Sequence, residues 1–353
     1  MLKTRLALSL KYSLLFALVV FLTACSGEQE QQPLRLQGQI FGSFWHATLP
    51  DDWTPEEAKL LQTGIQGELN KVDLAMSTYK PNSELNQFNR APLEEWVEVS
   101  APLFEVLKIS QEVAATSQGA FDVTLGGLVN LWSFGPEARP EKIPKTALLN
   151  ERLAMTGYQY LELDARQSVA RRLRNSSIDL SGVAKGYAVD KVAQWLREQG
   201  VDNFLINVSG EIIVAGERAA GQKWRIGVEV PDATQQAAQH IIPLANESVA
   251  TSGDYRNFYE VDGRRMSHTL DPRTGWPVSH NLASVTVIHP SNAVADAWAT
   301  AFMVLGTEAS LSLANSEKIK VMLISRENQT LKTQMSISLQ QALGSELTDK
   351  ILR

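Results

Sequence analysis

The sequence predicts an α+β fold in which mostly antiparallel sheets pack against helices. After residue 157 the predicted strands are short and come in runs, with helices inserted between them. Two of these strands are separated only by Asp262-Gly263, a dipeptide typical of a type I′ hairpin turn. Such runs favour antiparallel pairing over regular βαβ units. No internal repeat or strong linker divides the chain, so one large domain or two interleaved domains are expected.

The amino-terminal part is expected to contain one strand region followed by helices. Arg35–Leu49 is the strand region, and Thr54–Glu57 forms a capping box with proline at the first helical position. Apolar residues then recur at helical spacing as far as Met76. Further helices are expected over 100–118, ended by a glycine, and over Lys145–Thr156.

The remaining elements are shorter. The expected strands are Tyr158–Leu163, Ser168–Leu173, Ser177–Leu180, Asn203–Val208, Glu211–Ala215, Trp224–Val230, Ile241–Leu244, Tyr255–Val261, Arg264–Ser267, Ser284–His289 and Lys318–Ser325. Helices are expected over Val183–Gln199 and Asn292–Leu305, with one short helix before the last strand.

The first 25 residues predict an exported, lipid-anchored protein. A basic start is followed by the apolar run Ser13–Leu22 and by small residues before Cys25, the one cysteine of the chain. The run is too short to span a bilayer and is typical of a secretory signal. We expect residues 1–24 to be a lipoprotein signal peptide, Cys25 to carry lipid and residues 25–34 to be a tether. An ordinary signal peptide with a chance cysteine is the alternative.

Composition excludes one class of partner. The chain has 44% hydrophobic and 20% charged residues, as expected of a globular protein with a sizeable core. Its formal net charge is −6, and no basic stripe occurs. We therefore expect no nucleic-acid partner.

The segment Asp179–Asp190 predicts a strand, a tight turn with two glycines and the start of a helix. Such a junction directs free backbone N–H groups and the positive helix end toward one point, which suits a phosphate. Glycines at a strand–helix turn are also common for steric reasons alone. The motif is neither a P-loop nor a dinucleotide-binding fingerprint.

Ser267–Pro277 is a second candidate, because His268, Asp271 and Arg273 crowd a loop that follows a hairpin. Loops held by rigid strands often carry binding and catalytic groups. In the alternative, structural interpretation, Asp271 caps the bend and pairs with Arg273. His268 is the better chemical candidate.

Asp296 and Thr300 lie four residues apart on an expected helix and so share a face. Their neighbours are small or apolar, so this face should be buried. A buried carboxylate must be paired or bind a cation, and an oxygen-only pair suits Mg²⁺. The alternative is that Asp296 bonds to a neighbouring backbone group.

Two more segments combine aromatic and polar side chains. Met76–Tyr79 ends the long helix, and Gly119–Thr124 follows the second one. Either segment could flank a flat ring, or serve as core filling with a capped turn.

In this order, six segments of the chain resemble the ApbE family, flavin transferases that attach the FMN half of FAD to a protein threonine and release AMP. They are Met76–Tyr79, Gly119–Thr124, Asp179–Tyr187, Ser252–Tyr255, His268–Gly275 and Asp296–Ala301. The resemblance covers nearly all of the mature chain. It implies one T-fold-like catalytic unit over residues 35–353.

The resemblance also implies roles for residues. The metal ligands would be Asp296, Thr300 and the backbone carbonyl of Ala184, with Mg²⁺ as the cofactor. The flavin side would be held by Phe41, Tyr79, Gly119, Ala120, Phe121 and Asp122. The adenine and pyrophosphate side would be lined by Ser181, Lys185 and Tyr187, with His268 and Leu270 over the phosphates. Phe41-Gly42-Ser43 departs from the Met-Gly-Thr of many members.

The implied reaction needs Mg²⁺ to neutralise the pyrophosphate oxygens and a base to activate the threonine hydroxyl. His268 is favoured as that base over a carboxylate. The implied acceptors are subunits of the sodium-translocating NADH:quinone reductase or related electron-transfer complexes. This favours anchoring at the periplasmic face of the inner membrane, although Ser26 is usual for the outer membrane. The alternatives are a Mg²⁺-dependent FAD pyrophosphatase and a non-catalytic flavin-binding lipoprotein.

Overall fold

The computed structural model describes residues 32–137, 139–231, 238–255, 257–328 and 330–353. The predicted signal peptide and Cys25 lie outside these residues. Within the described ranges, no helix has the length and apolar character needed to cross a membrane.

An eight-stranded sheet forms the centre of the fold, and all its neighbouring strands pair antiparallel. Across the sheet the strands are β1 (Leu34–Ile40), β2 (Ser43–Leu49), β6 (Phe204–Val208), β7 (Glu211–Ala215), β10 (Ser248–Gly253), β13 (Leu282–His289), β14 (Lys320–Glu327) and β15 (Thr330–Met335).

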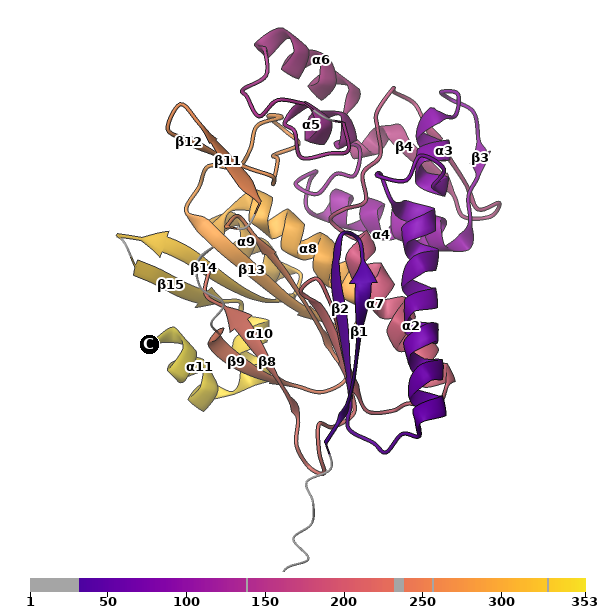
Figure 1. The fold of residues 1–353 in the computed structure, drawn as a ribbon. Helices are drawn as coiled ribbons and strands as arrows, with labels where there is room; N and C mark the ends of the chain where they lie inside the picture. Colours follow the sequence, from indigo (N-terminus) through magenta and orange to yellow (C-terminus); the bar gives the residue numbers. More distant parts are fainter. Residues whose placement is uncertain (1–31, 138, 232–237, 256, 329) are drawn as a thin grey trace, which may run out of the picture.

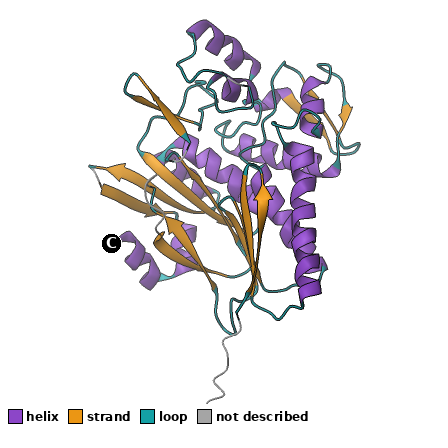
Figure 2. Ribbon diagram, in the orientation of Figure 1, coloured by secondary structure: helices purple, strands orange, loops and turns teal. Residues whose placement is uncertain are grey.

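Helices cover one face of this sheet, as Figures 1 and 2 show. They are α2 (Pro55–Met76), α4 (Ala101–Thr116), α7 (Ala184–Glu198) and α8 (Asn292–Leu305). The other face packs against the hairpin of β8 (Trp224–Glu229) and β9 (Ala238–Leu244), and against α10 (Ile337–Leu343) and α11 (Ser345–Leu352). Because side chains of a strand alternate between faces, Val321 and Leu323 join the helix-side core, whereas Met322 and Ile324 join the opposite one.

A third apolar cluster lies beside the main sheet. It joins α5 (Gly126–Leu131), α6 (Thr146–Met155) and the hairpin of β11 (Phe258–Val261) and β12 (Arg264–Ser267). The remaining elements are α3 (Glu84–Arg90), β3 (Val97–Glu98), the 3-10 helix Tyr158–Tyr160, β4 (Leu161–Asp164), β5 (Val169–Arg172) and α9 (Thr307–Ser316).

The predicted α+β class and antiparallel sheet are confirmed, as is the turn between β11 and β12, where Val261 pairs with Arg264. Three predicted strands were wrong in part or whole. The strand expected over Tyr255–Val261 begins at Phe258. Tyr158–Tyr160 is a 3-10 helix instead of the start of a strand. The expected strand 177–180 does not form, because the side chain of Asn89 takes both backbone groups of Ile178.

Candidate active site

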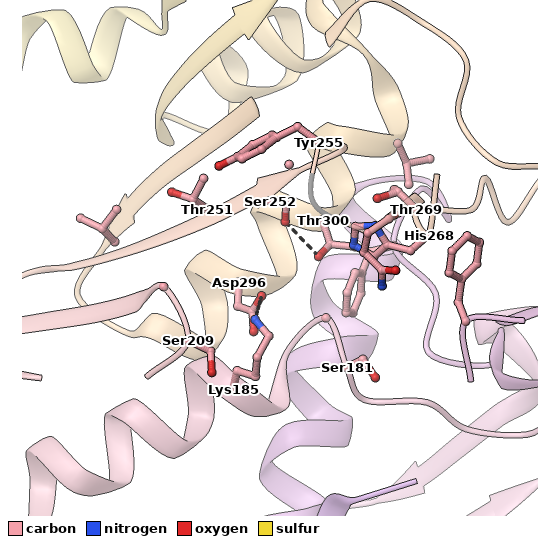
Figure 3. A pocket seen from close by; sticks show the side chains of 18 of the residues that line it. Ser181, Lys185, Ser209, Thr251, Ser252, Tyr255, His268, Thr269, Asp296 and Thr300 are labelled. Carbon is pink, nitrogen blue, oxygen red and sulfur yellow. Dashed lines mark hydrogen bonds and ion pairs between the residues drawn. The ribbon is translucent and has the colours of Figure 1, made fainter. Parts of the chain in front are cut away.

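A cavity of about 710 Å³ lies where α7, α8, the end of β10 and the loop after β12 meet (Figure 3). The helix side of its wall includes Lys185, Asp296 and Thr300. His268 and Leu270 line another part of it. The sequence segments that carry the candidate chemistry therefore converge on one cavity.

Close packing of α7 against the start of α8 positions Asp296. Asp190 of α7 accepts hydrogen bonds from the backbone N–H groups of Asn292 and Ala293 at 2.7 and 3.0 Å, which caps α8. A Cβ atom at Gly186 would lie only 2.4 Å from the carbonyl oxygen of Asn292, so this contact requires glycine. The second turn of α8 then brings Asp296 to the start of α7.

The buried acids Asp296 and Glu211 form a charged cluster with Lys185, which is partly exposed. The Gly186 N–H donates to Asp296 Oδ2 at 3.1 Å, and Lys185 Nζ lies 3.7 Å from Asp296 Oδ1. Lys185 also pairs with Glu211, whose Oε2 is buried without a hydrogen-bond partner. Burial raises the pKa of Asp296, and burial together with the Asp296 charge raises the pKa of Glu211 to about 8. Burial acts to lower the pKa of Lys185, but the two carboxylates outweigh it and raise that pKa.

The charges of this cluster fit an additional cation. Two carboxylates share one ammonium group, and Glu211 Oε2 has no donor. A buried negative charge without a partner is costly unless a proton or cation compensates it. No trio of His, Cys, Asp or Glu side chains suited to a metal occurs in the described ranges. A metal ion beside Asp296 would therefore depend on hydroxyl and carbonyl oxygens, which suit Mg²⁺.

Thr300 continues the polar surface of α8 into the cavity. Its hydroxyl lies 3.5 Å from that of Ser252 on β10 (Figure 3). A Cβ atom at Gly182 would lie 3.1 Å from the Thr300 hydroxyl and 3.2 Å from the Phe121 ring. The glycine thus leaves room between an aromatic ring and the hydroxyl.

The ring of His268 is held in one orientation. Its Nδ1 lies 3.0 Å from the carbonyl oxygen of Asn257, which also accepts the His268 backbone N–H at 3.1 Å. Because a carbonyl only accepts, Nδ1 carries the proton and Nε2 of the neutral ring is left as an acceptor. Burial lowers the pKa of His268 below its usual value, which favours this neutral form. The geometry is that of a candidate general base.

Aromatic side chains also line the cavity. Tyr79 is 66% exposed, and its hydroxyl donates to the carbonyl oxygen of Phe134 at 3.4 Å. Phe134 and Phe121 also line the cavity. Large exposed rings beside a cavity can stack on a flat ligand.

The sequence profile of the ApbE family matches residues 41–323 of the chain. The chain belongs to the ApbE family. The protein named FAD:protein FMN transferase of Escherichia coli strain K12 is 37% identical over 344 residues, which cover 94% of this chain and 97% of that protein. The protein of that name from Haemophilus influenzae is 36% identical, with coverages of 91% and 94%.

Solved structures of the ApbE family share the fold. The flavin transferase ApbE from Vibrio cholerae aligns with a TM-score of 0.81 at 37% identity and covers 88% of this chain and 99% of that one. The apo flavinyl transferase ApbE from Pseudomonas stutzeri also aligns with a TM-score of 0.81, at 35% identity and with coverages of 89% and 98%. These matches confirm the family and the α+β fold expected from the sequence.

The structure brings most of the predicted site residues of this ApbE-family chain to the cavity. Those that line it are Tyr79, Ala120, Phe121, Asp122, Ser181, Lys185, His268, Leu270, Asp296 and Thr300. The carboxylate of Asp122 is already engaged, because it accepts hydrogen bonds from the backbone N–H groups of Thr124 and Tyr158, both at 2.8 Å. Asp122 therefore also fixes the turn after Phe121.

Four predicted site residues are not part of the cavity lining: Phe41, Gly119, Ala184 and Tyr187. Phe41 occupies the turn between β1 and β2 with φ of 53°. Tyr187 is buried, and its hydroxyl donates to Glu105 Oε2 at 2.8 Å, toward α4. Its place on α7 explains the difference, because Tyr187 follows Lys185 by only two residues and projects from another side of the helix.

The predicted structural turn after Leu270 is present. Arg273 forms two side-chain hydrogen bonds with the Asp271 carboxylate, at 2.8 Å each, and Gly275 N–H donates to the Asp271 carbonyl. Asp271 and Arg273 therefore shape the loop of the ApbE-family site.

Sequence reasoning missed Glu211 and Asn257. Glu211 shares a strand face with Ile213 and Ala215, which are core residues, so strand alternation could have predicted a buried acid. Asn257 acts through its backbone carbonyl, for which the sequence carries no signal.

Proposed function

We propose that this ApbE-family enzyme transfers FMN from FAD to a threonine hydroxyl of a membrane redox protein and releases AMP, with Mg²⁺ as cofactor. The single observation that supports this most is one cavity lined by both the buried acid Asp296 and the oriented base His268. The names of the relatives, FAD:protein FMN transferase, support the donor and the type of acceptor.

Asp296, Thr300 and the backbone carbonyl of Ala184 would hold the Mg²⁺. Asp296 and Thr300 line the cavity, which supports their part in this donor set, whereas the Ala184 carbonyl rests on the family resemblance because Ala184 is not among the lining residues. When bound, the ion would neutralise the pyrophosphate oxygens that otherwise repel a nucleophile. Lys185 lies beside Asp296 and would place its ammonium group toward the same phosphates.

His268 would remove the proton from the acceptor hydroxyl. Its Nδ1–H is committed to Asn257, so Nε2 would take the proton while the threonine oxygen bonds to the FMN-side phosphorus. The bond from that phosphorus to the bridging oxygen would break, and AMP would leave with that oxygen. The FMN would remain on the acceptor as a phosphoester.

Tyr79 and Phe121 would hold the isoalloxazine. Tyr79 is the more exposed of the two, at 66%, and so is available to stack on a ring that arrives from solvent. Phe121 is only 3% exposed and would form the fixed side of the flavin site.

We also propose that lipid on Cys25 anchors the enzyme at the periplasmic face of a bacterial membrane, with the inner membrane favoured. The acceptors would be subunits of the sodium-translocating NADH:quinone reductase or related electron-transfer complexes. Residues 1–25 lie outside the described ranges. The proposal of an anchor is therefore supported by their sequence and by the family resemblance alone.

Incubation with FAD and Mg²⁺, with and without an acceptor subunit, tests the proposal. Transfer predicts FAD loss that depends on the acceptor, together with AMP and a flavin-bearing acceptor. Formation of free FMN and AMP at the same rate with and without the acceptor would indicate a pyrophosphatase. Intact FAD in both samples would indicate a binding protein.

A further inference from the structure

Asp254 joins three segments at the end of β10. Its side chain is buried, with 7% of the residue exposed. The Arg326 guanidinium donates to both carboxylate oxygens, at 2.9 and 3.0 Å, and Arg265 Nη1 donates to Oδ2 at 3.1 Å. Arg265 also donates to the backbone carbonyl of Asp254. Charge-assisted, two-point contacts of this kind fix orientation as well as distance.

The two arginines belong to different parts of the fold. Arg326 lies on β14 of the main sheet, whereas Arg265 lies on β12 of the two-stranded hairpin. In the described ranges β12 pairs only with β11, so no strand ladder joins the hairpin to the main sheet. Arg265 also covers the Phe258 ring of β11 at 4.0 Å. Asp254 thus fastens both strands of the hairpin to β14.

The same hairpin holds His268. Asn257 follows Asp254 by three residues, and His268 follows Arg265 by three. The Asn257 carbonyl accepts both the backbone N–H and the ring Nδ1–H of His268. The two chain segments that Asp254 fastens are therefore the two that set the orientation of the imidazole.

We propose that Asp254 is a positioning residue, which holds the hairpin so that Nε2 of His268 faces the acceptor hydroxyl. Asp254 does not line the cavity, so it would position His268 through the hairpin and not by direct contact with the reacting groups. The proposal rests on the proposed role of His268 as base. A small misplacement of a catalytic group can cost about 10²-fold in rate, so the effect should be measurable.

Glu247 provides a matched control. It directly precedes β10, as Asp254 directly follows that strand, and it pairs with Lys320 of β14 as Asp254 pairs with Arg326. Glu247→Gln therefore removes an ion pair between the same two strands at their other end, away from the hairpin. Both variants remove one charge and keep the shape of the side chain.

The test combines turnover with the tautomer of His268, read from ¹⁵N NMR of histidine-labelled protein. The chain has five histidines, so His268→Ala identifies the signal. We expect Asp254→Asn to lower kcat about 10- to 100-fold with unchanged FAD affinity, and to mix the two tautomers. Glu247→Gln should change neither readout. In a His268→Ala background, Asp254→Asn should add no further loss.

Unchanged turnover and tautomer in folded Asp254→Asn would overturn the proposal, as would an additive loss in the double variant. If His268→Ala retains full turnover, the base assignment fails, but the tautomer signal still reports on positioning by Asp254. If Asp254→Asn does not fold, Arg265→Lys replaces it, because lysine cannot reproduce both contacts to Asp254. A pure Nδ1–H tautomer with normal turnover in Arg265→Lys would then overturn the proposal.

Discussion

The Asp296 carboxylate of α8 accepts a hydrogen bond from the Gly186 backbone N–H in the first turn of α7, at 3.1 Å. The positive end of one helix thus faces the acid of the other. This junction was expected from its sequence to bind a phosphate, and one of its N–H groups is already used by Asp296. The contact makes the position of the proposed metal ligand depend on the packing of two helices.

Gly186→Ala should therefore damage both stability and activity. The new Cβ would meet backbone atoms of Asn292 and Ala293 at 2.4 to 2.8 Å, which cannot move aside as a flexible side chain could. We expect a loss of about 1–3 kcal/mol in the free energy of unfolding, as for other overpacked sites. Denaturant titration measures this loss, and FAD-dependent transfer should fall in the same variant.

Gly67→Ala is the matched control. Gly67 also lies within a helix, α2, but a Cβ there would have no neighbour within 4 Å. Alanine should stabilise the protein by about 0.5–1 kcal/mol without changing transfer. Equal stability of the two variants would contradict the account of the α7–α8 contact.

Asp296→Asn should lower transfer roughly 10²-fold or more, equal to about 2.7 kcal/mol of barrier, and raise the Mg²⁺ concentration needed for half-maximal rate. The shape of the side chain is kept, but the one charged ligand of the proposed set is lost. Thr300→Ala should cost less, about tenfold, because water can replace a neutral oxygen. A Mg²⁺ titration of the rate in both variants checks the order. Full activity of Asp296→Asn would refute the metal assignment.

The proposed role of His268 as base predicts that kcat decreases at acidic pH. In the proposed mechanism the neutral imidazole is the active form, so kcat should fall as the pH drops through its folded pKa. Burial and the Lys185 charge lower this pKa, whereas Asn257 and Asp254 act to raise it, with a net lowering from 6.5. The midpoint should therefore lie below about 6.5. His268→Ala should lose about 10²–10⁴-fold in kcat and lose this decrease at acidic pH. If His268→Ala loses FAD affinity but keeps its kcat, His268 is a phosphate contact and not the base.

The elements with strong periodicity could be predicted from the sequence, and the others could not. The capping box at Thr54 predicts the start of α2 at Pro55, and the apolar spacing predicts its end at Met76. Strand β10 was missed because SVATSG has little apolar alternation, although it is central in the sheet. The last two helices were missed because they are short and pack through few residues, such as Leu339 and Ile351.

The site could be predicted where side chains carry the chemistry. Asp296 and Thr300 share a helix face by spacing alone, and both line the cavity. The partner of Asp296 could not be foreseen, because Gly186 contributes only its backbone N–H. Tyr187 shows the opposite case, since this motif residue does not line the cavity and its hydroxyl donates to Glu105.

Cys25→Ser should release the enzyme from membranes without stopping catalysis in solution. The proposed site residues lie at position 41 and beyond, whereas the proposed anchor, Cys25, lies before the first described residue. The proposed lipid would confine enzyme and acceptor to one surface, so its loss should slow flavin attachment in cells through a lower effective concentration. Membrane fractionation and the transfer rate of the purified variant measure the two effects. A folded but inactive variant would contradict the division into tether and catalyst.

The nucleophile is tested most directly by mass spectrometry of the products of one reaction run in ¹⁸O-labelled water. The reaction contains the enzyme, FAD, Mg²⁺ and an acceptor subunit. Transfer to threonine predicts an acceptor peptide that carries FMN without ¹⁸O, and an equal amount of unlabelled AMP. FMN or AMP that contains ¹⁸O, with an unmodified acceptor, would show that water is the nucleophile and would contradict the proposed transfer.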